Sequence, residues 1–168
     1  MIINPSLLTT ILNICDQNGF GCGEENPFGL KMQFLTDNER VYSQVKVPSA
    51  MAGWDQAVHG GIISTIMDEI MGRAVIYLLQ KIAVTKSITV DFIKPLCVGR
   101  ELTAVSSIQG IQSEREVLVT GEIYSDEDTL CAKANGKFAT MSPESAVRLG
   151  VMSSEYMEGF MSLRNQNG

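Results

Sequence analysis

The sequence is poor in features that would place it in several large functional classes. It has a single histidine among 168 residues, and its four cysteines form no Cys-x-x-Cys pair, so a zinc site of familiar spacing is not expected. Asp and Glu (19) outnumber Lys and Arg (13), and the net charge of −6 leaves no basic footprint for nucleic acid or an anionic membrane. No apolar run approaches the roughly 20 residues of a membrane span.

The N-terminal region also lacks the basic stretch and following apolar stretch of a secretion signal, so we expect a cytoplasmic protein. In a reducing compartment free thiols are the default, and we expect them at Cys15, Cys22, Cys97 and Cys131. The apolar fraction of 45% and the chain length predict one domain with an adequate core.

Hydrophobic periodicity divides the chain into three parts. Residues 1–29 should begin with a short amphipathic helix over 5–14 and continue as a loop rich in turn-forming residues. Residues 30–141 form the main domain. The tail, residues 142–168, opens with Ser142-Pro143-Glu144, an N-cap signal that predicts a short helix.

Within the main domain, alternation predicts strands over 30–34 and 41–47 with a turn at Asp37-Asn38. The segment from about 60 to 79 is apolar around most of a helical circumference and should be enclosed. Four β-like runs follow it, at 82–94, 101–109, 115–125 and 129–140, and one of the links is a turn centred on Gly110. Short links favour an antiparallel meander, so the fold class is α+β, with a central helix wrapped by a curved antiparallel sheet.

The most informative segment runs from His59 to Arg73. Gly60 and Gly61 stand at the entrance of the helix, where backbone N–H groups at the positive end of the dipole suit a developing oxyanion. Asp68 lies two turns further along among isoleucines and methionines, where a carboxylate is costly unless something uses it. The combination indicates acyl chemistry. Close helix packing for the glycines, and a structural acid at a subunit seam for Asp68, remain the alternatives.

Glu69 competes with Asp68 for the role of the acid. Arg73 follows Glu69 by four residues on the same helix face, which favours an ion pair, whereas Asp68 has no basic residue in that position. Ser64 or Thr65, one turn earlier, is available to hydrogen-bond Asp68. We therefore assign the chemical role to Asp68.

The spacing of the two groups has a consequence for assembly. Gly60 and Asp68 are eight residues apart, which separates them by about 12 Å along a helix axis. One carbonyl carbon cannot lie within about 3 Å of both groups. If both act, they come from two chains whose helices lie side by side and antiparallel. The sequence therefore predicts a homodimer with two shared sites, alone or within a dimer of dimers.

The order of these segments resembles the hotdog-fold acyl-CoA thioesterases, and more narrowly the phenylacetyl-CoA and 4-hydroxybenzoyl-CoA thioesterase type. The resemblance covers about residues 20–140 and rests first on His59-Gly60-Gly61 followed by Asp68. Its supporting segments are Cys22-Gly23-Glu24-Glu25-Asn26-Pro27-Phe28-Gly29-Leu30, Gly53-Trp54 and Asp91-Phe92-Ile93-Lys94-Pro95-Leu96.

This resemblance implies three roles. The Gly60 N–H would polarise the thioester carbonyl, Asp68 would act as general base or nucleophile, and Thr85 would position the water. His59 would shape the loop rather than act as a base, although a lone histidine here also suits acid–base chemistry. Some relatives carry an Asn six residues before the histidine, where this chain has Gly53. The implied substrate is an acyl-CoA, with no metal and no cofactor beyond the coenzyme A of the substrate.

Further candidates for substrate binding are less specific. Trp54 suits either the acyl pocket or the dimer interface, and several basic residues suit either the phosphates of coenzyme A or a plain surface. These basic residues are Lys86, Lys94, Arg100, Lys133 and Lys137. The expected site therefore combines catalytic Asp68, Gly60 and Thr85 with substrate-binding His59, Gly61, Trp54, Ser64 and Lys94.

The same residues allow two rival functions. A non-catalytic acyl-CoA-binding protein of this fold would keep the Gly60 entrance but would not need Asp68, so the acid favours the enzyme. A hydratase would need a histidine paired with an acid, and His59 is the single histidine available. The acyl group and the choice between base and nucleophile stay open.

Overall fold

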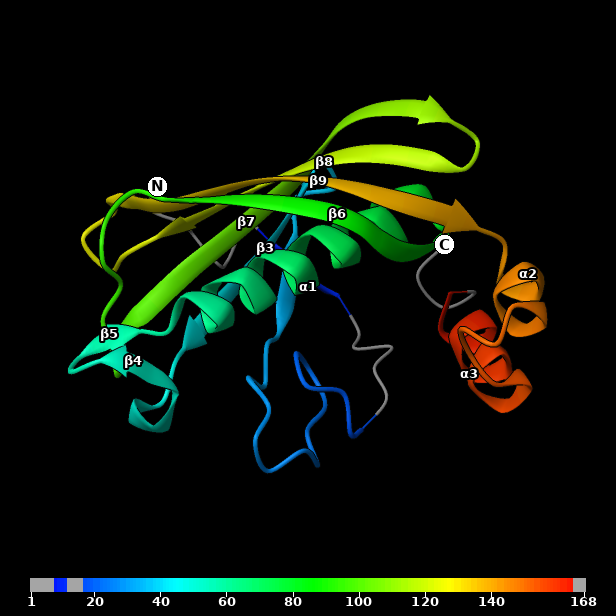
Figure 1. Ribbon diagram of the computed structural model, residues 1–168. Coiled ribbons are helices and arrows are strands. Elements are labelled where there is room, and N and C mark those ends of the chain that lie inside the picture. Colours follow the sequence, from blue (N-terminus) through cyan, green and yellow to red (C-terminus); the bar gives the residue numbers. More distant parts are fainter. Residues whose placement is uncertain (1–7, 12–16, 165–168) are drawn as a thin grey trace.

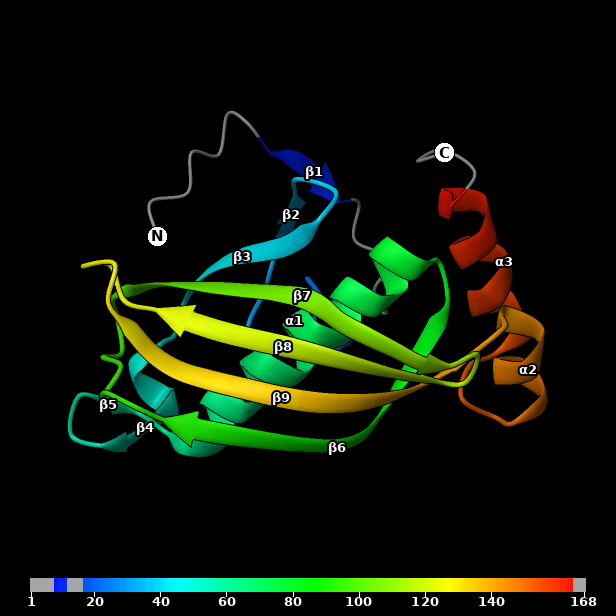
Figure 2. The same ribbon diagram turned by 90° about the horizontal axis from the view of Figure 1, so that it is seen from above.

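One long helix lies against the concave face of a curved antiparallel sheet (Figures 1 and 2). The computed structural model describes residues 8–11 and 17–164. The sheet has seven strands in the order β1-β2-β3-β7-β8-β9-β6, and helix α1 (Gly60–Leu79) packs beneath them. This is the predicted α+β architecture. No helix in the described ranges is long and apolar enough to cross a membrane.

The elements follow a simple plan along the chain. The strands of the large sheet are β1 (Thr9–Ile11), β2 (Phe34–Thr36), β3 (Arg40–Lys46), β6 (Ile82–Phe92), β7 (Glu101–Ser113), β8 (Glu116–Tyr124) and β9 (Leu130–Met141). A 3-10 turn (Ser49–Met51) and a small hairpin of β4 (Ala52–Trp54) and β5 (Ala57–Val58) precede α1, and helices α2 (Pro143–Arg148) and α3 (Ser154–Arg164) follow β9.

The helix predicted over residues 5–14 is wrong where the structure describes that segment. Leu8 lies in a bend, and Thr9–Ile11 form β1, which pairs antiparallel with β2. The edge of β2 offers a hydrogen-bonding partner, and β-branched residues suit a strand, so tertiary pairing overrides the helical spacing. The remainder of the predicted helix lies outside the described residues.

The four strands after α1 do not form a meander in sequence order. Strands β7, β8 and β9 follow one another, but β6 pairs with β9 rather than with β7, with Ile82 opposite Met141. The chain then crosses to β7, and the crossing segment is held by the hydrogen bond from Val58 N to Leu96 O (2.8 Å). β6 is therefore an edge strand of the sheet.

The turn expected at Gly110 lies further along the chain. Strand β7 continues through Gly110 to Ser113, and the chain reverses at Glu114 and Arg115. Glycine is compatible with a strand interior, and here the pairing of β7 with β8 is irregular on both sides of Gly110. A lone glycine was therefore an insufficient turn signal.

The thiol expectation also needs a correction. Cys22 is disulfide-bonded, whereas Cys97 and Cys131 are free. The prediction of free cysteines is therefore wrong for Cys22.

The tail contains two helices rather than one. Ser142 caps α2 as predicted, accepting a hydrogen bond from the Ser145 N–H (3.3 Å), and Pro143 occupies the first turn. Helix α3 follows, and its Phe160 packs with Ala146 of α2 and Ile82 of β6 in a small apolar cluster. The tail thus covers the end of the sheet where β6 begins.

Glycines in the sheet make room for α1. The side chains of Met67 and Met71 are fully buried, and both lie against Gly121 of β8. Met71 also lies against Gly136 of β9. The opposite side of α1 is only half-buried, so the helix is less enclosed than predicted, and Asp68 lies on this side.

Filling this space should destabilise the fold. In Gly136→Ala the new Cβ would lie 2.8 Å from Phe138 Cε2 and 3.3 Å from Met71 Cε, so we expect a loss of about 1–3 kcal/mol in the free energy of unfolding, measured with urea. Gly110→Ala is the matched control, because its Cβ would meet no atom closer than Gln112 Nε2 at 3.7 Å. The control should be neutral or more stable by up to about 1 kcal/mol. Equal losses in both variants would contradict the packing argument.

Candidate active site

His59 organises the entrance of α1. It is the N-cap residue, with an extended backbone, and its Nδ1 accepts a hydrogen bond from the Gly61 N–H at 2.9 Å. Because Nδ1 accepts this bond through its lone pair, the imidazole ring caps the N-terminus of α1. This contact is the loop-shaping role that the resemblance implied for His59.

The cap leaves the neighbouring amide available. Within the described residues, no acceptor is found for the N–H of Gly60. A Cβ at this position would lie 3.5 Å from Cζ of Phe92, so the aromatic ring at the end of β6 covers the glycine. Gly60 therefore presents a free donor at the positive end of the helix dipole, beside an apolar wall.

The hydroxyl groups of Ser64 and Thr65, in the second turn of α1, point back toward the entrance. Ser64 Oγ donates to Gly60 O (3.0 Å) and Thr65 Oγ1 donates to Gly61 O (2.9 Å). The hydrogen bond to Asp68 that the sequence made available to Ser64 or Thr65 is therefore not formed by either hydroxyl. Ser64 thus helps to hold the glycine entrance, and its expected contact with substrate stays a prediction.

Asp68 and Thr85 form the second half of the site. The Thr85 hydroxyl donates to Asp68 Oδ1 at 2.5 Å, and both residues are half-buried. The pairing of β6 with β9 shifts between Thr85 and Ser87, and such bulges re-aim side chains. Thr85 thus lies beside Asp68, as the roles that the resemblance implied for these two residues require.

Glu69 has different surroundings. Burial raises the pKa of Glu69, the charge of Arg73 opposes the rise, and the charge of Asp68 adds to it. A Cβ at Gly21 would lie only 2.1 Å from Glu69 Cδ, so the loop backbone packs directly on this side chain. Neighbouring side chains on a helix point about 100° apart. Glu69 therefore packs against the loop, whereas Asp68 accepts the hydrogen bond from Thr85.

Arg73 fixes the same loop. Its guanidinium is buried, donates to Cys22 Sγ (3.2 Å) and lies 4.6 Å from the centre of the Phe34 ring. Burial lowers the pKa of Arg73, and the carboxylate of Glu69 counteracts this. The charges of Glu69 and Arg73 therefore act on one another within a buried cluster beneath the loop, and the ion pair itself stays a prediction.

The remaining candidates lie apart from these two half-sites. Trp54 is 86% exposed in the β4–β5 hairpin. Its neighbour Gly53 packs closely, because a Cβ there would lie 3.1 Å from His59 Cα. Lys94 lines a cavity of about 300 Å³ with Cys97 and Arg100, and neither half-site contributes to the cavity lining.

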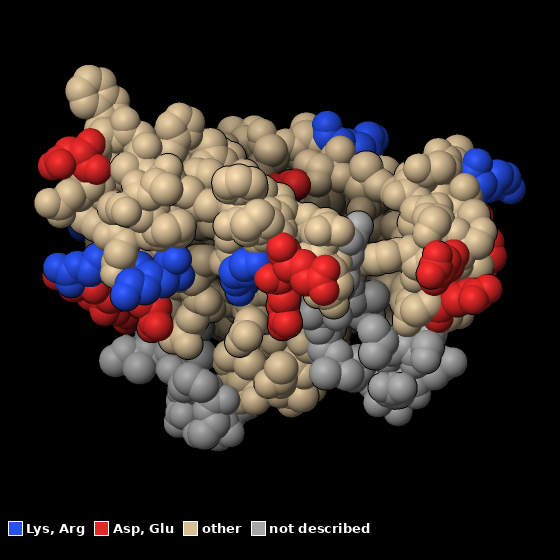
Figure 3. Space-filling view, turned by 90° about the horizontal axis from the view of Figure 1, so that it is seen from below, with Lys and Arg blue, Asp and Glu red and all other residues tan. Residues whose placement is uncertain are grey.

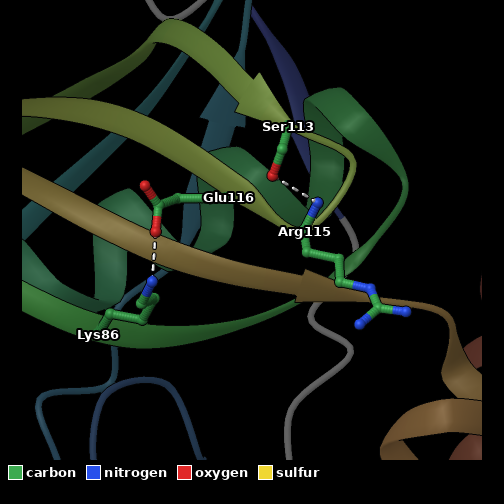
Figure 4. A network of polar contacts seen from close by, with 4 residues as sticks. All are labelled: Lys86, Ser113, Arg115 and Glu116. Atoms are coloured by element: carbon green, nitrogen blue, oxygen red, sulfur yellow. Dashed lines mark hydrogen bonds and ion pairs between the residues drawn. The ribbon is translucent and has the colours of Figure 1, made fainter.

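Two basic candidates have structural partners. Lys86 forms an ion pair with Glu116 across the outer surface of the sheet (Figure 4). Arg100 is likewise paired, with Asp126 at 2.8 Å.

Sequence reasoning did not identify Phe92 as the residue that covers Gly60, although Phe92 lies in one of the segments that carried the resemblance.

Comparisons with known proteins agree with this picture. The family model described as the Thioesterase superfamily matches residues 55–132, a range that includes the helix entrance, Asp68 and Thr85. No curated protein sequence matches the chain.

Several solved structures share the fold. A thioesterase superfamily protein gives a TM-score of 0.67 at 20% identity, over 73% of this chain and 60% of that one. The PaaI protein of the E. coli phenylacetic acid degradation operon gives 0.60 at 22% identity, over 66% and 83% of the two chains. A hypothetical thioesterase from Streptococcus pneumoniae TIGR4, solved with coenzyme A, gives 0.58 at 21%, over 62% and 80%.

The chain spans 60% of the length of the first of these structures. The fold and the family match together confirm the resemblance drawn from the sequence: the protein has the hotdog fold and carries the thioesterase-superfamily sequence pattern across residues 55–132.

Proposed function

We propose that this protein is a cytoplasmic acyl-CoA thioesterase whose two active sites are each shared between two chains. The observation that carries the proposal is the hydrogen bond from Thr85 to Asp68, because it holds a carboxylate in place at a half-buried position. The unoccupied N–H of Gly60 supplies the complementary donor. The E. coli and S. pneumoniae structures add support, since one belongs to a phenylacetic acid degradation operon and the other holds coenzyme A.

The chemistry follows from these groups. With Oδ1 engaged by Thr85, the other oxygen of Asp68 accepts a proton from an attacking water, or attacks the thioester carbon itself to form an anhydride. The carbonyl oxygen becomes an oxyanion, which the Gly60 N–H of the second chain stabilises. The carbon–sulfur bond then breaks, which gives the free acid directly when water attacks; when Asp68 attacks, water hydrolyses the anhydride in a second step and regenerates the carboxylate. A thiol has a pKa of about 8.5, so the thiolate of coenzyme A leaves without needing an acid.

The surface around Asp68 suits a second copy of the chain. The unpaired edge of β6 flanks the half-buried side of α1, and Val84, Phe92 and Ile93 are exposed there. Figure 3 views the molecule from the face opposite the sheet, and its upper part, along the β6 edge, is mostly uncharged. An exposed strand edge with apolar neighbours favours pairing, so we place the twofold axis of the homodimer beside β6 and α1.

Removing the carboxylate charge should abolish most of the activity. We expect wild type to cleave at least one thioester in an acyl-CoA panel and Asp68→Asn to lose about 100-fold or more in kcat, as is typical for loss of a catalytic base. Release of free thiol is the measurement.

The adjacent acid provides a matched control. Glu69→Gln makes the same chemical change one residue away and should keep kcat within about threefold, since Glu69 packs against the loop. If the two variants lost activity equally, the assignment of Asp68 would be wrong. If wild type bound coenzyme A but cleaved no thioester, the protein would be a binding protein instead.

Sharing of the site can be tested by complementation. Gly60→Pro deletes the amide donor with little disturbance, because proline suits the first helical position and His59 already has the backbone angles (φ −61, ψ 135) preferred before proline. We expect this variant and Asp68→Asn each to be inactive as homodimers. A mixed dimer has one complete site, so co-refolding equal amounts should restore about a quarter of wild-type activity. A mixture no more active than its components would rule out the shared site.

A further inference from the structure

A cationic cavity lies at the end of the sheet where β9 finishes. It measures about 540 Å³ and is bounded by the β7–β8 turn, the end of β9 and helix α2. Lys81, Arg115 and Arg148 line it, and each comes from a different segment of the chain. Among the described lining residues one is acidic, Glu114. Three converging cations are unexpected in a chain with a net charge of −6.

The cations have weak partners within the fold. Lys81 Nζ donates to the backbone carbonyl of Glu114 (3.1 Å), and Arg148 reaches the Ser145 hydroxyl at 3.5 Å, the limit of a hydrogen bond. The Arg115 guanidinium makes no hydrogen bond or ion pair with any described residue.

Figure 4 shows the direction of Arg115. Its side chain extends across the end of β9, away from the ion pair between Lys86 and Glu116. Lys86 thus forms an ion pair with an acid, whereas Arg115 forms none with the described residues. Three cations beside a single acid, Glu114, repel one another, and an anion bound between them would relieve that repulsion.

The cavity lining also suits a phosphate group chemically. Guanidinium groups bind phosphate oxygens through paired, charge-assisted hydrogen bonds, and an ammonium group adds a compact charge. The lining also contains the hydroxyl-bearing residues Thr140, Ser142 and Ser145, beside the apolar residues Ala139, Met141 and Leu149. A cavity of this composition favours an anion with several oxygens over an apolar ligand.

The cavity lies within reach of the Asp68–Thr85 pair. Residues Ala139 and Met141 of its lining pair with Val84 and Ile82, the residues of β6 that precede Thr85. Lys81, at the far side, is four residues from Thr85, or about 13 Å of extended chain. The arm of coenzyme A between its sulfur and its first phosphate is about 15 Å long at the bond spacing of an extended chain.

We propose that this cavity binds the phosphate groups at the nucleotide end of the thioester substrate, an inference that rests on the proposed acyl-CoA thioesterase function. The thioester then lies at Asp68, the arm follows the start of β6, and the phosphates meet Arg115, Arg148 and Lys81. Binding at this distance anchors the substrate without touching the reacting carbon, so it should affect KM rather than kcat.

The test uses the double variant Arg115→Gln/Arg148→Gln with two substrates that share one acyl group. The first is the acyl-CoA, and the second is the N-acetylcysteamine thioester, which lacks phosphates. We expect KM for the acyl-CoA to rise about tenfold with kcat unchanged, and KM for the second substrate to stay the same. Lys46→Gln is the control, since this exposed lysine lies on β3 outside the cavity lining and should change neither value.

A calorimetric titration with adenosine 3′,5′-bisphosphate tests the cavity without catalysis. Wild type and Lys46→Gln should bind it, and the double variant should lose the binding. Unchanged KM for the acyl-CoA, equal losses with both substrates, or equal weakening by Lys46→Gln would overturn the proposal. If wild type cleaved neither thioester, the proposed function would fail, and the titration would still decide whether the cavity binds phosphates.

Discussion

The hydrogen bond between Thr85 and Asp68 is the interaction on which the proposed site depends. It joins the middle of α1 to the edge strand β6 and holds one carboxylate oxygen at 2.5 Å from a hydroxyl group. A carboxylate on an apolar helix is costly without such a partner. Thr85 satisfies one oxygen and leaves the other for chemistry, so a single strand residue both stabilises the acid and orients it.

This contact depends in turn on how α1 sits in the sheet. Gly121 and Gly136 give Met67 and Met71 room to pack, which fixes the depth of the helix, and the bulge after Thr85 adjusts the direction of its side chain. The buried cluster of Glu69 and Arg73 anchors the loop on another side of α1. The two adjacent acids therefore differ in role: Glu69 packs against the loop, and Asp68 lies half-buried at the surface of α1.

Local patterns predicted the parts of the fold that local interactions decide. The apolar run and the glycine pair placed the helix at residues 60–79, and alternation placed the strand at 41–47 close to β3. The strand predicted over 30–34 is wrong for residues 30–33, since β2 spans Phe34–Thr36. The position of β6 beside β9 could not be predicted, because either neighbour satisfies the same alternating pattern and the choice depends on long-range packing. For the same reason the pairing of Thr9–Ile11 with β2 was missed.

The candidate site divides in a similar way. The resemblance located Asp68, Thr85 and Gly60, since their spacing along the chain is a sequence property. The covering of Gly60 by Phe92 and the meeting of Lys81, Arg115 and Arg148 depend on segments far apart in sequence, so only the folded chain reveals them.

A rigid helix also explains why one chain is insufficient for the proposed reaction. The entrance amide and Asp68 are carried by the same helix at about 12 Å along its axis, and no loop movement can shorten that distance while the helix persists. An antiparallel neighbour removes the difficulty, because its entrance then lies beside the middle of the first helix. The same symmetry creates two equivalent sites from one surface. In this arrangement the edge of β6 and the half-buried side of α1 form the subunit interface, and each proposed active site lies within it.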